Sequence, residues 1–192
     1  SSGEILLNNI NIKSFNYLEY RDIFGTVFQN YKSFEFSIAE NVALNKFNNS
    51  IDCRNKVEKQ LSEVGLLDKI NSLPKNILTM LGRLFDDEGT KFSGGELQKL
   101  ALAKALYREP KIIILDEPTS ALDPFAEDDL IRTFGEAARG KMVFYISHRL
   151  SVAKYADKVI FIDDNTISGF DTHEQLIKNN PRYAEMYEAQ AK

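Results

Sequence analysis

The chain has 192 residues, of which 43% are hydrophobic and 27% are charged, and this composition excludes the intrinsically disordered class. The net charge of −4 at pH 7 argues against a nucleic-acid partner, because nucleic-acid-binding domains usually present a basic face. Cys53 is the only cysteine, which excludes an internal disulfide and a cysteine-rich metal site.

The first half of the sequence predicts two short strands followed by a mainly helical segment. Ser37 and Glu40 have the spacing of a capping box, in which each side chain bonds the other residue's backbone N–H at a helix start. Further on, apolar residues recur at helical spacing and Gly65 follows them as a helix end. The elements expected in this half are a strand over residues 4–12 with a turn at Asn8-Asn9, a strand over Thr26–Phe28 that ends at Gln29, and a helical insert over residues 38–88.

The second half of the sequence alternates strands with helices. Ser93 and Glu96 form a second capping box, and Pro110 ends the helix that it opens. Asp123, with Pro124 at the first helical position, starts the next helix. This alternation predicts an α/β fold with a mainly parallel sheet covered by helices. The remaining expected elements are strands over Lys111–Leu115, Met142–Ile146 and Val159–Ile162, and helices that begin after Thr172 and Asn180.

Two acids follow the apolar strand Lys111–Leu115. Ligands of α/β sheets bind at the carboxyl ends of the strands, so Asp116 and Glu117 stand where a ligand would bind. Adjacent side chains of an extended chain point in opposite directions, which lets one acid hold Mg²⁺ while the other polarises a water molecule. Taken alone, such a pair of acids favours a solvated turn after the strand.

A glycine-rich sequence opens the helix that precedes these acids. Ser93 and Glu96 suffice to cap a helix, but Gly94 and Gly95 are poor helix residues that each cost ~1 kcal/mol relative to alanine. Two glycines leave the backbone N–H groups of the first turn unshielded, and the helix dipole adds positive potential there. The pattern therefore favours close approach by a phosphate group.

Gln29 and His148 are weak signals when taken alone, since a lone histidine after a strand is more often structural. Together with the motifs above they form an ordered series, which is Gln29, Ser93-Gly94-Gly95-Glu96, Asp116-Glu117, Ser120-Ala121-Leu122-Asp123 and His148. This order of motifs resembles the ATP-binding-cassette (ABC) ATPase family nearly end to end.

The resemblance implies ATP and Mg²⁺ as cofactors and a role for each matching residue in ATP hydrolysis. By this resemblance Gln29 would contact both the metal ion and the reacting water, and Asp116 would hold Mg²⁺. Glu117 would act as general base, and His148 would contact the γ-phosphate. At a dimer interface, the signature motif would bind the γ-phosphate of ATP held by the opposite subunit. This motif consists of Ser93, Gly94, Gly95 and Glu96. Asp123 would lie at the same interface. Two departures are Phe92, where leucine is commoner, and Glu96, where glutamine is commoner, so that a negative charge stands near a phosphate site.

The resemblance also implies the domain organisation. It predicts a P-loop NTPase fold of the ABC ATPase type and one domain over residues 1–192. Within that domain, residues 1–36 and 111–192 would form the catalytic core, and residues 37–110 a helical subdomain that carries the signature.

The C-terminal part resembles the exporter branch of the family, through the sequences at 147–151 and 172–176. This implies a transport-coupled ATPase at the cytoplasmic face of the cell membrane, without a nucleic-acid partner. Its expected partners are a second nucleotide-binding domain, in a homodimer or pseudo-dimer, and a transmembrane domain. The latter would contact the stretch after Gln29 and the segment Gly82–Gly89.

No Gly-Lys-Ser or Gly-Lys-Thr sequence occurs in the chain. Gly135–Met142 has the spacing of a phosphate loop, but Met142 replaces the hydroxyl residue and the segment would run from helix to strand, the reverse of such a loop. We therefore expect the N-terminal strand, the Walker A loop and its helix to be absent. By this hypothesis residues 1–192 alone are a truncated domain that neither binds ATP well nor hydrolyses it.

Two other functional classes are compatible with these motifs. A soluble ABC ATPase acting on DNA or ribosomes would usually carry a coiled-coil insertion or a basic face, and the sequence has neither. A degenerate half that only donates its signature has no need of Asp116, Glu117 and His148, which are all present.

Overall fold

The computed structural model describes residues 3–29, 33–84, 86–119 and 124–190. The chain forms two compact units, Ser1–Ile146 and Ser147–Lys192. Among the described residues, no helix has the length and the apolar character needed to cross a membrane.

The N-terminal residues form a small hairpin, β1 (Leu6–Leu7) and β2 (Ile10–Asn11), paired antiparallel. Asn8 and Asn9 make the turn with φ values of 51° and 63°, a left-handed conformation that asparagine tolerates better than most residues. The predicted turn is therefore confirmed. The short helices that follow, η1 (Ile12–Ser14) and α1 (Tyr17–Asp22), were not predicted.

A three-stranded parallel sheet forms the centre of the first unit, in the order β3 (Phe24–Val27), β4 (Ile112–Asp116), β5 (Met142–Ile146). β3 begins two residues before the predicted strand and ends at Val27. The helix α6 (Pro124–Ala137) connects β4 to β5, as expected for parallel neighbours. Because α6 precedes β5, Gly135–Met142 runs from helix to strand and is not a phosphate loop.

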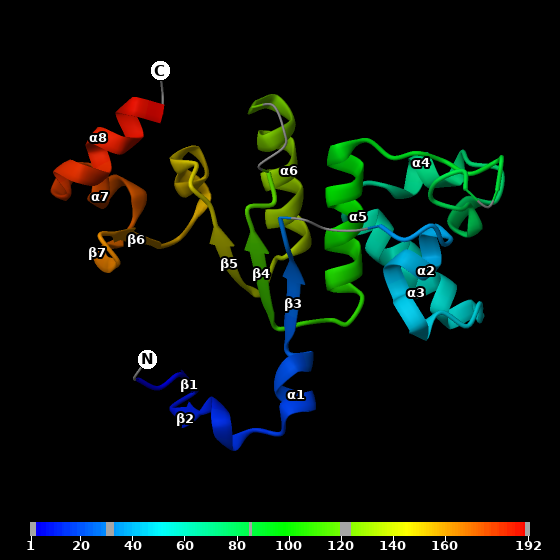
Figure 1. The fold of residues 1–192 in the computed structure, drawn as a ribbon, viewed down its shortest axis with the longest axis horizontal. Coiled ribbons are helices and arrows are strands. Elements are labelled where there is room, and N and C mark those ends of the chain that lie inside the picture. The colour runs from blue at the N-terminus through cyan, green and yellow to red at the C-terminus, as the bar shows by residue number, and fades with distance from the viewer. Residues whose placement is uncertain (1–2, 30–32, 85, 120–123, 191–192) are drawn as a thin grey trace. The chain divides into compact units, whose positions relative to one another are not determined.

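A helical region is inserted between β3 and β4, as predicted (Figure 1). Val57 and Leu61 of α3 and Leu102 and Leu106 of α5 are fully or almost fully buried in the main hydrophobic core. Phe92, which precedes the glycine-rich start of α5, also packs against this core. The helices of the region are α2 (Ile38–Ala43), η2 (Leu44–Lys46), α3 (Ile51–Glu63), α4 (Leu67–Asn71), η3 (Asn76–Leu78) and α5 (Gly94–Leu106).

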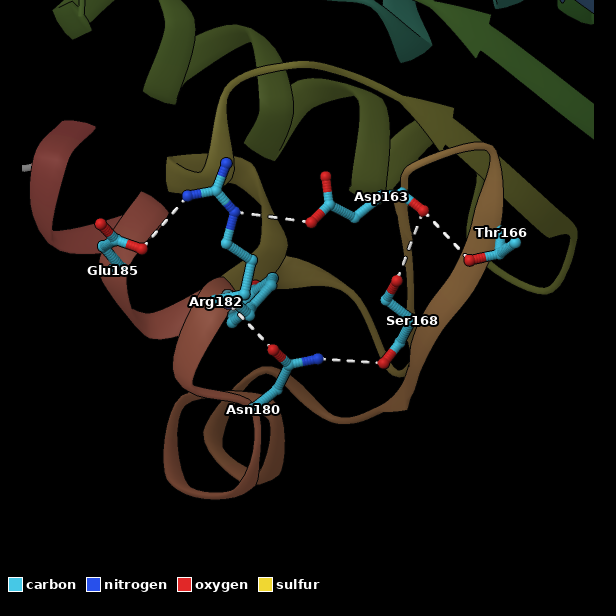
Figure 2. Close-up of polar contacts among 7 residues, drawn as sticks. Asp163, Thr166, Ser168, Asn180, Arg182 and Glu185 are labelled. Carbon is cyan, nitrogen blue, oxygen red and sulfur yellow. Dashed lines mark hydrogen bonds and ion pairs between the residues drawn. The ribbon is translucent and has the colours of Figure 1, made fainter.

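The second unit packs a hairpin against two helices around Phe161 and Tyr183. The predicted strand at Val159–Ile162 exists, but its described partner is an antiparallel strand that was not predicted. Arg182, on the last helix, joins that helix to the hairpin by an ion pair with Asp163 at 3.5 Å, and also pairs with Glu185 of the same helix at 3.1 Å (Figure 2). The elements are η4 (Leu150–Tyr155), β6 (Val159–Asp163), β7 (Thr166–Asp171), α7 (His173–Asn179) and α8 (Pro181–Gln190).

Candidate functional site

The two predicted acids lie at the carboxyl end of the central strand. Asp116 is the last residue of β4, and the side chains of Asp116 and Glu117 are both half-buried. The backbone N–H of Glu117 donates to the carbonyl oxygen of Ile146 on β5 at 2.9 Å. Glu117 has φ of 48°, the left-handed region that a residue with a side chain rarely adopts. Such backbone strain clusters at functional sites, where the rest of the fold maintains it.

Gln29 lies at the same edge of the sheet as these acids. β3 is parallel to β4 with Val27 opposite Leu115, and Gln29 and Glu117 each follow these paired residues by two positions. The Gln29 side chain is exposed. A carboxylate and an amide at one sheet edge are oxygen donors of the kind that Mg²⁺ prefers.

No group of three or more acids, histidines or cysteines gathers as a metal site within the described residues. Mg²⁺ is usually held by one or two protein carboxylates together with substrate phosphates and water. Asp116 with Gln29 therefore fits Mg²⁺ that arrives with a phosphate substrate, and does not fit a metal caged by protein side chains alone.

The glycine-rich sequence starts α5 with the predicted capping box. The Ser93 backbone N–H donates to Glu96 Oε2 at 2.8 Å, and the Glu96 N–H donates to Ser93 Oγ at 3.4 Å. Ser93 and Gly94 are exposed, and Gly95 is half-buried. A Cβ atom added to Gly94 would meet nothing within 4 Å, so packing inside this chain does not require a glycine there. This leaves space at the helix N-terminus for an external anion.

Lys69, which the sequence did not single out, pairs with Glu96 at this helix start. Its Nζ donates to Glu96 Oε1 at 2.6 Å and lies 5.0 Å from the centroid of the Phe92 ring. Partial burial works to raise the pKa of the Glu96 carboxyl, but the hydrogen bonds from Lys69 and Ser93 outweigh it and hold the pKa below its ordinary range. The extra negative charge at position 96 is therefore paired within the chain.

Aromatic residues are exposed next to Gln29. Phe28, Phe34 and Phe36 are all exposed, and the rings of Phe34 and Phe36 stack with centroids 5.9 Å apart. Phe28 and Phe34 line a cleft of about 220 Å³ with residues of α5, among them Lys104. The Lys104 ammonium lies 5.3 Å from the Phe34 ring centroid, and burial lowers its pKa. An exposed apolar patch of this kind is typical of a protein interface.

His148 belongs to the second unit, where its side chain is exposed. The side chain of Gln190, at the end of α8, holds the backbone on both sides of the next residue, Arg149. Gln190 Nε2 donates to the carbonyl oxygen of His148 at 2.9 Å, and Gln190 Oε1 accepts from the N–H of Leu150 at 2.7 Å. Asp123, which was predicted to lie at the dimer interface, is outside the described residues together with Ser120–Leu122.

Comparisons with known proteins match nearly the whole chain. A family model described as ABC transporter matches residues 1–120. The chain is 39% identical over 188 residues to the subtilin transport ATP-binding protein SpaT of Bacillus subtilis. It is 35% identical over 189 residues to an ATP-dependent lipid A-core flippase of Photobacterium profundum. Both matches cover 98% of this chain, but only 30% and 31% of the respective relatives.

A solved structure, that of a bacterial Atm1-family ABC exporter with ATP bound, is similar with a TM-score of 0.82 and 30% sequence identity. The match covers 100% of this chain and 32% of the exporter chain. The chain thus spans about a third of the length of these similar proteins.

Proposed function

Because this chain belongs to the ABC transporter family, whose members are generally ATPases, we propose that the full-length protein to which it belongs hydrolyses ATP with Mg²⁺ and couples hydrolysis to export. The predicted α/β fold of the ABC ATPase type is confirmed by the parallel sheet with its helices and by the similarity to the exporter structure. The observation that carries the proposal is the placement of Gln29, Asp116 and Glu117 at one edge of that sheet.

Residues at the sheet edge would position and activate the attacking water. Bound Mg²⁺ neutralises charge on the transferred phosphoryl group. We assign Asp116, with Gln29, to holding this ion, and Glu117 to accepting the proton of the water. The strained backbone of Glu117 supports this assignment, because such strain clusters at functional sites.

The start of α5 would contact the ATP that a second nucleotide-binding domain binds. Ser93, Gly94 and Gly95 supply a hydroxyl and backbone N–H groups at a positive helix end, where the exposure of Ser93 and Gly94 leaves room for a γ-phosphate. We place Asp123 at the same dimer interface and assign His148 to contact with the γ-phosphate. These two roles rest on the family motifs.

A transmembrane domain would bind the region after Gln29. The exposed rings of Phe28, Phe34 and Phe36 supply an apolar surface for such a partner. The relatives named above include a transport protein and a lipid A-core flippase. We therefore propose an exporter whose nucleotide-binding domain works at the cytoplasmic face of the cell membrane. Within it, residues 1–36 and 111–192 would be the catalytic core and residues 37–110 the helical subdomain.

Replacing the general base tests this proposal. In the full-length protein, Glu117→Gln should retain ATP binding and lose most turnover, by ~100-fold or more, because proton abstraction and water positioning are lost together. Binding is measured with a fluorescent ATP analogue and turnover by phosphate release. Unchanged turnover would remove Glu117 from the role of base.

The segment 1–192 provides a second test. It contains no Gly-Lys-Ser or Gly-Lys-Thr sequence, so we expect the purified segment alone neither to bind ATP well nor to hydrolyse it. Saturable micromolar ATP binding by a preparation whose intact mass matches these residues would contradict this expectation.

A further inference from the structure

Lys69 contacts both residues that flank the Ser93-Gly94-Gly95 sequence. It donates to the carboxylate of Glu96, which follows the sequence, and lies over the ring of Phe92, which precedes it. The second carboxylate oxygen of Glu96 bonds the backbone N–H of Ser93. Lys69, on α4, therefore connects to the N-cap of α5 through a continuous chain of contacts.

The charge of Glu96 is a problem for a phosphate site. Glu96 lies in the first turn of α5, close to where Ser93 and Gly94 would receive the γ-phosphate. A carboxylate there competes with the phosphate for the positive helix end and repels it. A cation bonded to that carboxylate at 2.6 Å offsets the repulsion.

We propose that Lys69 is a positioning residue of the signature, which fixes Glu96 in the capping box and neutralises it so that the phosphate of a partner's ATP can bind. The proposal rests on the function assigned above to Ser93 and Gly94. It adds a residue from a separate helix to the half-site, by which we mean the phosphate-binding residues Ser93, Gly94 and Gly95 at the start of α5.

Lys56, on α3, provides a matched control, because it pairs with a residue near the other end of α5. Its Nζ lies 3.0 Å from Glu109 Oε1 and 5.1 Å from the Tyr107 ring centroid, just beyond the C-terminus of α5. The side chains of Lys56 and Lys69 have the same exposure, 38%. The two lysines thus share their pairing chemistry and differ in whether the signature is nearby.

The experiment compares Lys69→Met with Lys56→Met in the full-length protein, by ATPase rates over a range of ATP concentrations. Lys69→Met should raise the KM for ATP about fivefold. This factor corresponds to ~1 kcal/mol, which is the upper end for an exposed ion pair. Lys56→Met should leave the KM unchanged. The KM increase should shrink when salt rises from 0.05 to 0.5 M, because salt screens the exposed charge. Both variants should melt at similar temperatures.

Two further variants separate charge from structure. Lys69→Arg should keep the KM low, and Glu96→Gln added to Lys69→Met should recover most of the loss, because no uncompensated charge remains. The proposal is overturned if Lys69→Met behaves like Lys56→Met, or if its defect persists in the double variant and at high salt.

The variant Gly94→Asp shows whether a negative result disproves only the role of Lys69 or the proposed function as well. It puts a negative charge directly into the half-site, where the chain itself leaves space. If Gly94→Asp leaves turnover unchanged, the signature binds no phosphate and both the proposed function and the role of Lys69 are wrong. If Gly94→Asp abolishes turnover while Lys69→Met has no effect, only the role of Lys69 is wrong.

Discussion

The hydroxyl of Thr119 donates a 2.6 Å hydrogen bond to the carboxylate of Glu127, and both side chains are buried. Thr119 follows Glu117 by two residues, and Glu127 lies on α6, so this bond connects the turn after the acidic pair to the next helix. The hydroxyl of Tyr145, on β5, lies 3.3 Å from the same Thr119 oxygen. The turn is thus held from two neighbouring elements.

Thr119→Val should lower the free energy of unfolding by ~1–3 kcal/mol, because a buried carboxylate loses a hydrogen bond that valine cannot replace. The matched control is Thr133→Val on α6, whose hydroxyl bonds the Asp129 carbonyl oxygen at 2.9 Å in an exposed position. The control should change stability by less than ~0.5 kcal/mol. Urea unfolding of both variants gives the comparison, and equal losses would contradict the importance of the buried bond.

Gly25→Ala should destabilise the central sheet. A Cβ atom at Gly25 would lie 2.7 Å from Cγ of Pro110 and 2.9 Å from the carbonyl oxygen of Ala105, closer than real contacts allow. We expect a loss of ~1–3 kcal/mol, as for other overpacked sites. Gly135→Ala on α6 meets nothing within 4 Å and should instead add ~0.5–1 kcal/mol through helix propensity. A stability change of the same sign in both variants would disprove the steric argument.

Gly94→Ala should separate stability from activity. The added methyl group meets nothing within 4 Å, so the melting temperature should not fall. Turnover by the full-length protein should fall by ~10- to 100-fold, because the methyl group displaces the phosphate of the partner's ATP from the helix start. Gly135→Ala, in the same protein, should keep wild-type turnover. Normal turnover of Gly94→Ala would mean that no ligand approaches this glycine.

The Lys69–Glu96 pair predicts a pH dependence of stability. The pKa of Glu96 is lower in the folded chain than in the unfolded chain, so the unfolded state binds more protons as the pH falls. The contribution of the pair is therefore complete above the ordinary carboxyl pKa of about 4.3 and is lost below it. Because both side chains are partly exposed, the effect should stay below ~1 kcal/mol.

Unfolding in urea between pH 7 and pH 3 measures this effect. The wild type should lose more stability than Glu96→Gln over the acidic end of this range. The same replacement made in the Lys69→Met background should alter the pH dependence much less. An identical difference in both backgrounds would show that Lys69 does not cause the shift.

Local sequence patterns predicted most elements of the fold. The two capping boxes at Ser37 and Ser93 form as expected, since their bonds join residues three positions apart. The hairpin turn at Asn8-Asn9 was predicted, but the equivalent signal at Asp164-Asn165, with φ of 47° and 60°, was missed. The strand β7 was missed with it, and so was the antiparallel pairing of β6.

The residues of the candidate site also fall into those that local sequence patterns predicted and those that they did not. Residue types and spacing alone selected Asp116 with Glu117 and the Ser93–Glu96 motif, because backbone geometry over a few residues fixes what they can do. Lys69 was missed because it precedes Glu96 by 27 residues on a different helix, a separation that no local spacing rule covers. Thr119 and Glu127 were missed because the burial that makes their bond matter depends on the packing of α6.

The sequence by itself determined the family, the order of the motifs and the chemistry that each motif offers, since these depend on residue identity and on short-range backbone geometry. Only the tertiary structure decided that Gln29 and Glu117 share one sheet edge, that Glu117 holds a left-handed backbone, and that the charge of Glu96 is paired. These features arise from strand register and helix packing, which bring together residues that lie far apart along the chain.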